Sequence, residues 1–375
     1  MLRRLLPLCL VVSGMSSLVL EVAWSRSLSL SLGNSHQAVA TVVASMMAGL
    51  CLGSLLAARR LHRVIRNLAR AYGWVEMGIG CFAALTPLMF RALPVLLDPL
   101  YALPLPAFAF IRFLLVFALL LPASAGMGAT LPLATAALAR LRHAEEGGAE
   151  GPGSASLGGK LYGLNTLGAF IGTLAGGFLL LPILGLLGTT LFAAATSFAV
   201  GVAAWALSRT AGGPPPGVIP TPAHSGGVRL SGWILPLYAA SGSLAMIFEI
   251  TWTRVLGPLA GTSVYSFTLI LGAILAGIGA GSLALSHRRL TTVDPARGFV
   301  VGEILLALFA FASAWGLKFF PDLLLLTLAR SSATPFAVLS REFILFGVIV
   351  LPPALLLGGL FPFAVRLVQI GRAHV

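Results

Sequence analysis

Charged residues are scarce in this chain. They make up 9% of the 375 residues, and only 11 residues are Asp or Glu, whereas apolar residues make up 58%. A soluble domain carries about a quarter charged residues, because water must wet its surface. The scarcity of charge therefore excludes a soluble globular domain and indicates that most of the chain lies in lipid.

Cysteine and histidine are also rare. The three cysteines, Cys9, Cys51 and Cys81, lie inside apolar segments without CxxC spacing, and the six histidines are scattered. Disulfide frameworks and zinc sites need such residues at short, regular spacing. We therefore expect no disulfide framework, no metal site and no cofactor in this chain.

Long basic runs are missing as well, although the formal net charge is +13. Lys and Arg occupy short segments between apolar runs, which excludes the continuous basic surface of a nucleic-acid-binding protein. Loops rich in Lys and Arg face the cytoplasm in membrane proteins. If successive apolar segments cross the membrane in alternating directions, most basic residues lie on the same side of the membrane as the N-terminus. We expect an integral protein of the cell (inner or plasma) membrane with a cytoplasmic N-terminus.

Ten segments have the roughly 20 apolar residues that a membrane-spanning helix needs. The expected spans are 5–31, 36–58, 71–92, 106–138, 161–183, 187–207, 232–258, 263–286, 298–319 and 337–368. The fourth and tenth are long and contain prolines, which predicts kinks or tilts. The first is longer than the apolar core of a signal peptide, and it recurs later in the chain.

The second half of the chain repeats the first at an offset of 228 residues. Glu21, Trp24 and Arg26 recur in the same order, and the small-residue motif AGLCLGSL recurs as AGIGAGSL. The equivalents are Glu249, Trp252, Arg254 and residues 276–283. Further on, Glu76 corresponds to Glu303, and Arg112 approximately to Arg341. Six spans separate the copies, so both have the same orientation, which is the arrangement of major-facilitator transporters.

These observations predict an all-α integral membrane protein, a major-facilitator-like bundle of two parallel six-helix repeats. We expect the first repeat at 1–209, a cytoplasmic linker at 210–230, and the first four helices of a truncated second repeat at 231–369. Residues 370–375 (IGRAHV) are expected to be a non-native tail, because codons that encode them resemble sequencing-adapter read-through.

Four segments resemble the membrane region of fused major-facilitator/spermidine-synthase proteins. They are SGMSSLVLEVAWSRSLSLSLGNS, AGLCLGSLLAARRL, LPASAGMGATLPL and GKLYGLNTLGAFIGTLAGGFLLLPILGLLG. The resemblance covers nearly all of 10–368. It implies that the membrane region precedes a cytosolic aminopropyltransferase-like domain, and it associates the chain with polyamines. That domain's Gly-rich nucleotide loop and acidic residues are not found in this sequence.

Intramembrane charges are the first candidate functional residues, because they are costly in lipid. We hypothesise that Glu21 pairs with Arg112 and Glu249 with Arg341. Each pair is either a structural ion pair that fixes helix register, or a substrate or proton site. Asn165, at the start of the fifth span, either bonds a neighbouring helix or lines a cavity.

A second group of candidates lies at the expected cytoplasmic side. Glu76 and Glu303, with Arg63 and Arg66 in the adjoining loop, are candidates for a cytoplasmic gate. The alternative, which we favour, is a solvated basic cluster of the kind found in cytoplasmic loops. Trp24, Trp252, Arg26 and Arg254 fit an interfacial aromatic belt with snorkelling arginines.

Glycines at GxxxG spacing form a third group, which allows close helix packing. They are Gly49, Gly53, Gly277, Gly281, Gly168, Gly172 and Gly176. Packing is the favoured interpretation, and a sliding interface for alternating access is the alternative.

Three functions remain open. The chain is expected to be the membrane domain of a spermidine-synthase-like fusion protein that transports polyamines or related small cations. The alternatives are an anchor for the missing synthase-like domain and a stand-alone transporter of another substrate. Its expected partners are the lipid bilayer, a polyamine and that domain, and no nucleic acid. Whether the full-length protein is an enzyme stays open.

Overall fold

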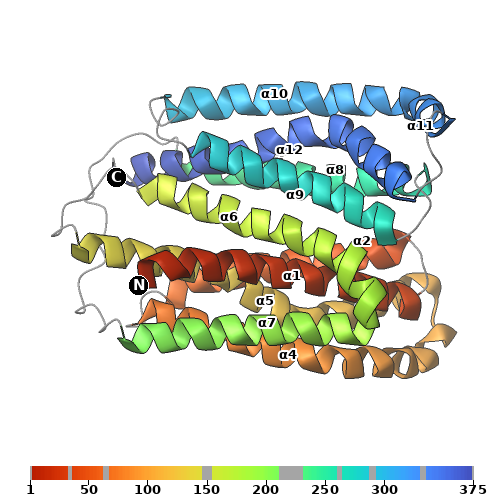
Figure 1. The fold of residues 1–375 in the computed structure, drawn as a ribbon, viewed down its shortest axis with the longest axis horizontal. Coiled ribbons are helices and arrows are strands. Elements are labelled where there is room, and N and C mark those ends of the chain that lie inside the picture. Colours follow the sequence, from red (N-terminus) through yellow and green to blue (C-terminus); the bar gives the residue numbers. More distant parts are fainter. Residues whose placement is uncertain are drawn as a thin grey trace. The chain divides into compact units, whose positions relative to one another are not determined.

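The computed structural model describes residues 2–32, 36–61, 67–145, 154–210, 231–259, 264–286, 293–329 and 335–373. Helices are the only regular elements in these ranges (Figure 1). In lipid, a helix satisfies its own backbone hydrogen bonds, and long apolar runs therefore fold this way. Eight helical stretches among the described residues are long and apolar enough to cross a membrane. The chain is thus all-α and suited to a bilayer; the number of spans stays a prediction.

The helices divide into two compact units. Unit 1 is Met1–Ala149 with Ile171–Gly217, and unit 2 is Glu150–Phe170 with Val218–Val375. Unit 1 contains α1 (Leu2–Leu32), α2 (His36–Leu56), η1 (Ala57–Leu61), α4 (Leu68–Leu97), η2 (Asp98–Ala102), α5 (Leu105–Glu145), η3 (Gly176–Leu180) and α7 (Leu181–Thr210). Unit 2 contains α8 (Ser231–Leu259), α9 (Val264–Leu285), α10 (Pro295–Gly316), η5 (Leu317–Phe319), α11 (Phe320–Ala329) and α12 (Pro335–Ala373).

Helix α6 (Ser154–Ala175) is shared between the units. Its first part, up to Phe170, packs within unit 2, where the Ser282 hydroxyl donates to the Gly159 carbonyl at 2.9 Å. Its last residues belong to unit 1, where a Cβ at Gly172 would clash with the Met15 carbonyl. The compact units therefore divide the chain differently from the expected boundary at 209/210.

Contacts fix the relative directions of α1, α4, α6 and α7 in and beside unit 1. Ser13 of α1 contacts Glu76 of α4, and Trp24, farther along α1, contacts Thr86, farther along α4. Helices α1 and α4 are therefore parallel. Gly73 lies against Gly201, and Gly80 against Ala194, so α4 and α7 are antiparallel. The end of α6 runs parallel to α1, because Gly172 meets Met15 and Gly176 meets Val19. The chain therefore reverses between the end of α6 and the main part of α7.

Gly185 makes this reversal. Residues 157–209 form one apolar helical stretch of 53 residues. Within it Gly185 has φ 65° and ψ −177°, which breaks the helix. Glycine tolerates a positive φ because it has no Cβ. Figure 1 shows the chain turning back at the start of α7. The break lies between the expected spans 161–183 and 187–207.

The same helix crossing occurs in both units. In unit 1, a Cβ at Gly53 of α2 would clash with the Ala125 carbonyl of α5, and one at Gly128 with the Leu50 carbonyl. In unit 2, Gly281 of α9 meets the Leu355 carbonyl of α12, and Gly358 meets that of Ile278. The α2 and α9 positions differ by 228 residues, and the α5 and α12 positions by 230. Backbones approach this closely only where side chains are small.

Helices α4 and α10 begin in the same way. The Asn67 side chain accepts a hydrogen bond from the Arg70 backbone N–H at 3.0 Å, and Asp294 accepts one from that of Arg297 at 3.2 Å. Such caps satisfy backbone donors at a helix start. The two caps lie 227 residues apart, the same offset that relates Glu76 to Glu303.

Candidate functional site

Glu76 is the most completely enclosed carboxylate among the described residues. It lies on α4 with an exposed fraction of 0%, and the Ser13 hydroxyl of α1 donates a hydrogen bond to its Oε1. The hydroxyl of Tyr72, one turn earlier, interacts with Ser13 and Glu76, although neither this hydroxyl nor Glu76 Oε2 has a hydrogen bond of ordinary geometry among the described residues. No basic side chain pairs with Glu76 in this part of the structure. The sequence favoured a solvated basic cluster here, which is wrong for Glu76.

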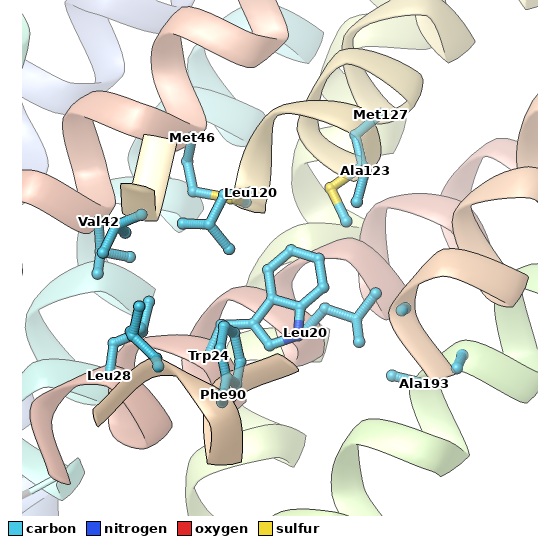
Figure 2. Close-up of a cluster of buried hydrophobic side chains, with 14 of the residues drawn as sticks. Leu20, Trp24, Leu28, Val42, Met46, Phe90, Leu120, Ala123, Met127 and Ala193 are labelled. Carbon is cyan, nitrogen blue, oxygen red and sulfur yellow. The ribbon is translucent and has the colours of Figure 1, made fainter. Parts of the chain in front are cut away.

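A second polar contact joins α1 to α4. The Trp24 indole N–H donates to the Thr86 hydroxyl at 2.9 Å, and that hydroxyl donates to the Ala83 carbonyl at 2.7 Å. Trp24 has an exposed fraction of 0%. Figure 2 shows its ring among Leu20, Leu120, Met127 and other core side chains. Trp24 is therefore a core residue, and its expected place in a lipid-facing aromatic belt is wrong; Trp252 is buried as well.

Unit 2 repeats the serine and the carboxylate. Ser241 of α8 corresponds to Ser13, and Glu303 of α10 corresponds to Glu76. Both line a cavity of about 390 Å³ between α8, α10 and α12, together with Phe248, Trp252 and Phe311. The Ser241 hydroxyl interacts with the Glu303 carboxyl, although neither this hydroxyl nor Glu303 Oε1 has a hydrogen bond of ordinary geometry among the described residues. One carboxylate is thus enclosed in unit 1, and its counterpart faces an open space in unit 2.

The two copies place a tyrosine differently. In unit 2, Phe299 occupies the position that corresponds to Tyr72. The tyrosine of unit 2 is instead Tyr238 on α8, and its ring centroid lies 6.5 Å from that of Phe299. Each unit therefore combines a serine, a carboxylate and a tyrosine at the α1–α4 or α8–α10 pair. Sequence reasoning missed the serines as site residues. The recurrence of Ser13 as Ser241, at the 228-residue offset of the repeat, was the signal that could have identified these serines.

The other intramembrane charges are spread along α1, α5, α8 and α12. Glu21 is buried with 6% exposed, whereas Glu249, Arg112 and Arg341 are half-buried. Both proposed ion pairs stay predictions. Helices α5 and α12 are each continuous, so the offset of 230 that relates Gly128 to Gly358 makes Glu342, rather than Arg341, the repeat equivalent of Arg112. Glu342 is a buried acidic residue that sequence reasoning missed.

The remaining candidates fall into three groups. Arg63 and Arg66 lie outside the described residues, so the gate with Glu76 and Glu303 stays a prediction. Asn165 is half-buried on α6, and Gly168 is buried there. A Cβ at Gly49 would clash with the Ser124 side chain and one at Gly277 with Ala354, whereas a Cβ at Gly176 would make ordinary contact with Val19 at 3.5 Å.

Comparisons with known proteins supply no further assignment. No protein-family model, no curated protein and no solved structure matches the chain.

Proposed function

We propose that the chain is the membrane domain of a major-facilitator-like protein that transports a polyamine or a related cation. The proposed architecture contains two parallel repeats that share the same helix order. Its support is the matching α2–α5 and α9–α12 crossings, the matching helix caps, and the relative directions of α1, α4, α6 and α7.

The recurring pair of a serine and a carboxylate carries the functional part of the proposal. Glu76 and Glu303 lie within apolar helices, and no basic side chain pairs with either among the described residues. A carboxylate without a basic partner is costly in a membrane, so it is retained where it binds a proton or a cation. The same position in both units is acidic, which supports a role shared by both halves. A polyamine fits a carboxylate beside aromatic rings, because both attract ammonium groups.

An anchor for a synthase-like domain is the second candidate. The complete enclosure of Glu76 and its bond from Ser13 favour it, because a closed polar contact fixes the packing of α1 on α4. For an anchor, substitution of the carboxylates changes stability and leaves cation movement unaffected.

Uptake of radiolabelled spermidine into proteoliposomes tests the proposal. The expected result is uptake by the unaltered chain and at least a tenfold loss in both Glu76→Gln and Glu303→Gln. Asp98→Asn is the matched control, because it removes the same charge from an exposed residue of η2. Equal uptake by all variants, or none by the unaltered chain, contradicts the proposal.

Labelling with dicyclohexylcarbodiimide provides an independent measurement, because this reagent modifies protonated carboxyl groups in apolar surroundings. We expect mass spectrometry to find modified Glu303, and we expect spermidine to reduce the modification. Modification that spermidine does not change favours the anchor.

A further inference from the structure

The side chain of Glu76 has no free space around it. The Ser13 hydroxyl of α1 donates a hydrogen bond to its Oε1, and the buried hydroxyl of Tyr72 interacts with the same carboxyl group. Its exposed fraction of 0% means that no space as large as a water molecule touches the side chain. Glu303 differs, because it is half-buried and lines the cavity of about 390 Å³ in unit 2. Of these two carboxylates, only that of Glu303 has room beside it for a ligand larger than water.

Helix α7 closes the α4 surface on both sides of Glu76. A Cβ at Gly73 would lie 2.8 Å from the Gly201 carbonyl oxygen. One at Gly80 would lie 2.6 Å from the Ala194 carbonyl oxygen. Helix backbones approach this closely only where the facing residues are small. These contacts leave no gap between α4 and α7 through which an amine or a hydrated ion could reach the carboxyl group.

The charged residues of α5 lie far from the level of Glu76. Gly126 of α5 packs against Ile79 and thus marks that level. The nearest charged residues of α5, Arg112 and Arg140, are each 14 residues from Gly126, about 21 Å along the helix axis. This distance exceeds the length of an arginine side chain, so α5 supplies no counter-charge to Glu76.

Helices α7 and α4 likewise keep their charged groups away from Glu76. On α7, Arg209 is eight residues beyond Gly201, about 12 Å along the axis. Its guanidinium group lies over the Trp205 ring, 4.5 Å from the centroid. On α4, the exposed Arg70 lies about 9 Å before Glu76 along the axis. Both arginines are therefore at the end of the helix and not at the enclosed carboxyl group.

Uncharged titratable groups face Glu76 instead. They are the Cys9 thiol of α1 and the Tyr72 hydroxyl of α4, each close enough to interact with the carboxyl group. The nearest charged residue that follows Ser13 on α1 is Glu21, which is acidic and eight residues away. Within the described residues, the helices around Glu76 therefore bring it no counter-charge, and an unpaired charge inside a membrane is costly.

A proton is the cation that this environment can hold. An ammonium group is at least as large as a water molecule, for which there is no space. A metal ion takes several ligands, and the described part of the chain contains no group of three His, Cys, Asp or Glu residues that could hold one. A neutral carboxyl group has one acceptor oxygen and one O–H donor. This combination suits the two neighbouring hydroxyls, those of Ser13 and Tyr72.

We propose that Glu76 is the proton-binding site of the chain and that Glu303 binds the ammonium group of the transported amine, so that a proton gradient drives transport. The inference rests on the proposed transport function. One O–H bond forms on the Glu76 carboxylate when the proton binds and breaks when it leaves. Release needs water at the carboxyl group, so α1 and α7 must separate from α4 at this level during transport.

Infrared difference spectroscopy of the full chain in nanodiscs tests the protonation of Glu76 without transport. The carbonyl stretch of a protonated carboxyl group is distinct from the bands of a carboxylate and shifts in D2O. We expect the spectrum of the unaltered chain minus that of Glu76→Gln to show one protonated carboxyl band, which spermidine leaves unchanged. The control is Asp98→Asn, whose difference spectrum should show carboxylate bands only. Carboxylate bands for Glu76, or a band that spermidine removes, overturn the inference.

A second variant keeps the test valid if Glu76→Gln does not fold. Ser13→Ala keeps the carboxyl group and removes the hydrogen bond to its Oε1. A hydrogen bond to a carbonyl oxygen lowers its stretching frequency, so we expect the protonated carboxyl band to move to higher frequency in Ser13→Ala. A spectrum that Ser13→Ala leaves unchanged overturns the assignment of the band to Glu76.

Proteoliposomes separate the driving force from amine binding. With spermidine on both sides, exchange of the radiolabel needs no proton gradient, whereas accumulation needs one. We expect Glu76→Gln to keep exchange and to lose accumulation driven by a pH gradient at least tenfold, and we expect Glu303→Gln to lose both.

The outcomes distinguish this inference from the proposed function. Accumulation that Glu76→Gln leaves intact, or that does not depend on the pH gradient, overturns the inference while the transport proposal stands. Loss of both exchange and accumulation in Glu76→Gln also overturns it, because the residue then acts in amine binding. If the unaltered chain moves no spermidine, the transport proposal fails and the role of the proton in transport fails with it.

Discussion

At the scale of single residues, the polar groups of unit 1 form specific bonds between helices. Trp24 and Thr86 make one such contact, and Ser13 and Glu76 make another. Sequence reasoning identified Trp24 and Glu76 as unusual residues in apolar helices. It could not find their partners, because Ser13 and Thr86 lie 63 and 62 residues away along the chain. Only packing decides which hydroxyl meets which group.

Replacing Thr86 by Ala should destabilise unit 1. The change leaves the buried indole N–H of Trp24 without its acceptor, which costs about 1–3 kcal/mol in proteins generally and about 0.6 kcal/mol for an average interhelical bond in a membrane. We expect a loss of about 1 kcal/mol, measured by denaturation with sodium dodecyl sulfate. Thr196→Ala is the control, because this exposed hydroxyl bonds only the Phe192 carbonyl of its own helix. Equal stability of the two variants contradicts a role for the Trp24–Thr86 bond.

At the scale of helices, small residues determine how closely pairs approach. The glycines at positions 49, 53, 277 and 281 were predicted from spacing alone, and the structure places them against α5 and α12. The identity of the facing backbone was not predictable, since many apolar helices offer similar surfaces. Similarly, the spacing did not predict Gly128 and Gly358 as reciprocal contacts, because each lacks a GxxxG partner.

Gly53→Ala and Gly281→Ala should destabilise the chain to a similar extent. The added Cβ meets a backbone carbonyl in each unit, and overpacking costs about 1–3 kcal/mol. The control is Gly78→Ala on α4, where no atom lies within 4 Å of the added Cβ. There, the better helix propensity of alanine should stabilise the helix by about 0.5–1 kcal/mol. Thermal unfolding in detergent measures all three. If Gly78→Ala lowers the stability as much as Gly53→Ala does, close contact with a backbone carbonyl is not the cause of the destabilisation.

At the scale of the whole molecule, the chain reverses its direction at Gly185 in unit 1, and alternating passage across the membrane is the prediction that follows. The 53-residue apolar stretch 157–209 is long enough for two spans, and Gly185 divides it. The sequence predicted a boundary between 183 and 187 from the length of the apolar run. The left-handed backbone at Gly185 explains why the reversal needs glycine there.

Reporter fusions should detect this alternation. Alkaline phosphatase, which is active only outside the cytoplasm, should be active when fused after Leu103 or Gly185 and inactive after Thr210. Green fluorescent protein fused at the same sites should give the opposite pattern. A phosphatase that is inactive after Gly185 contradicts the reversal between α6 and α7, and an inverted pattern at all sites contradicts the cytoplasmic N-terminus.

The sequence by itself determined the environment and the internal repetition of this protein. Scarce charge and long apolar runs require lipid, and rare residues recurring at one offset reveal a repeat without any coordinates. Tertiary structure alone decided which polar groups meet, because hydrogen bonds depend on helix rotation and crossing as well as on spacing. It also decided that Glu76 is enclosed by α1 and α4 while Glu303 faces a cavity, since the enclosure of a side chain depends on how closely the neighbouring helices pack around it.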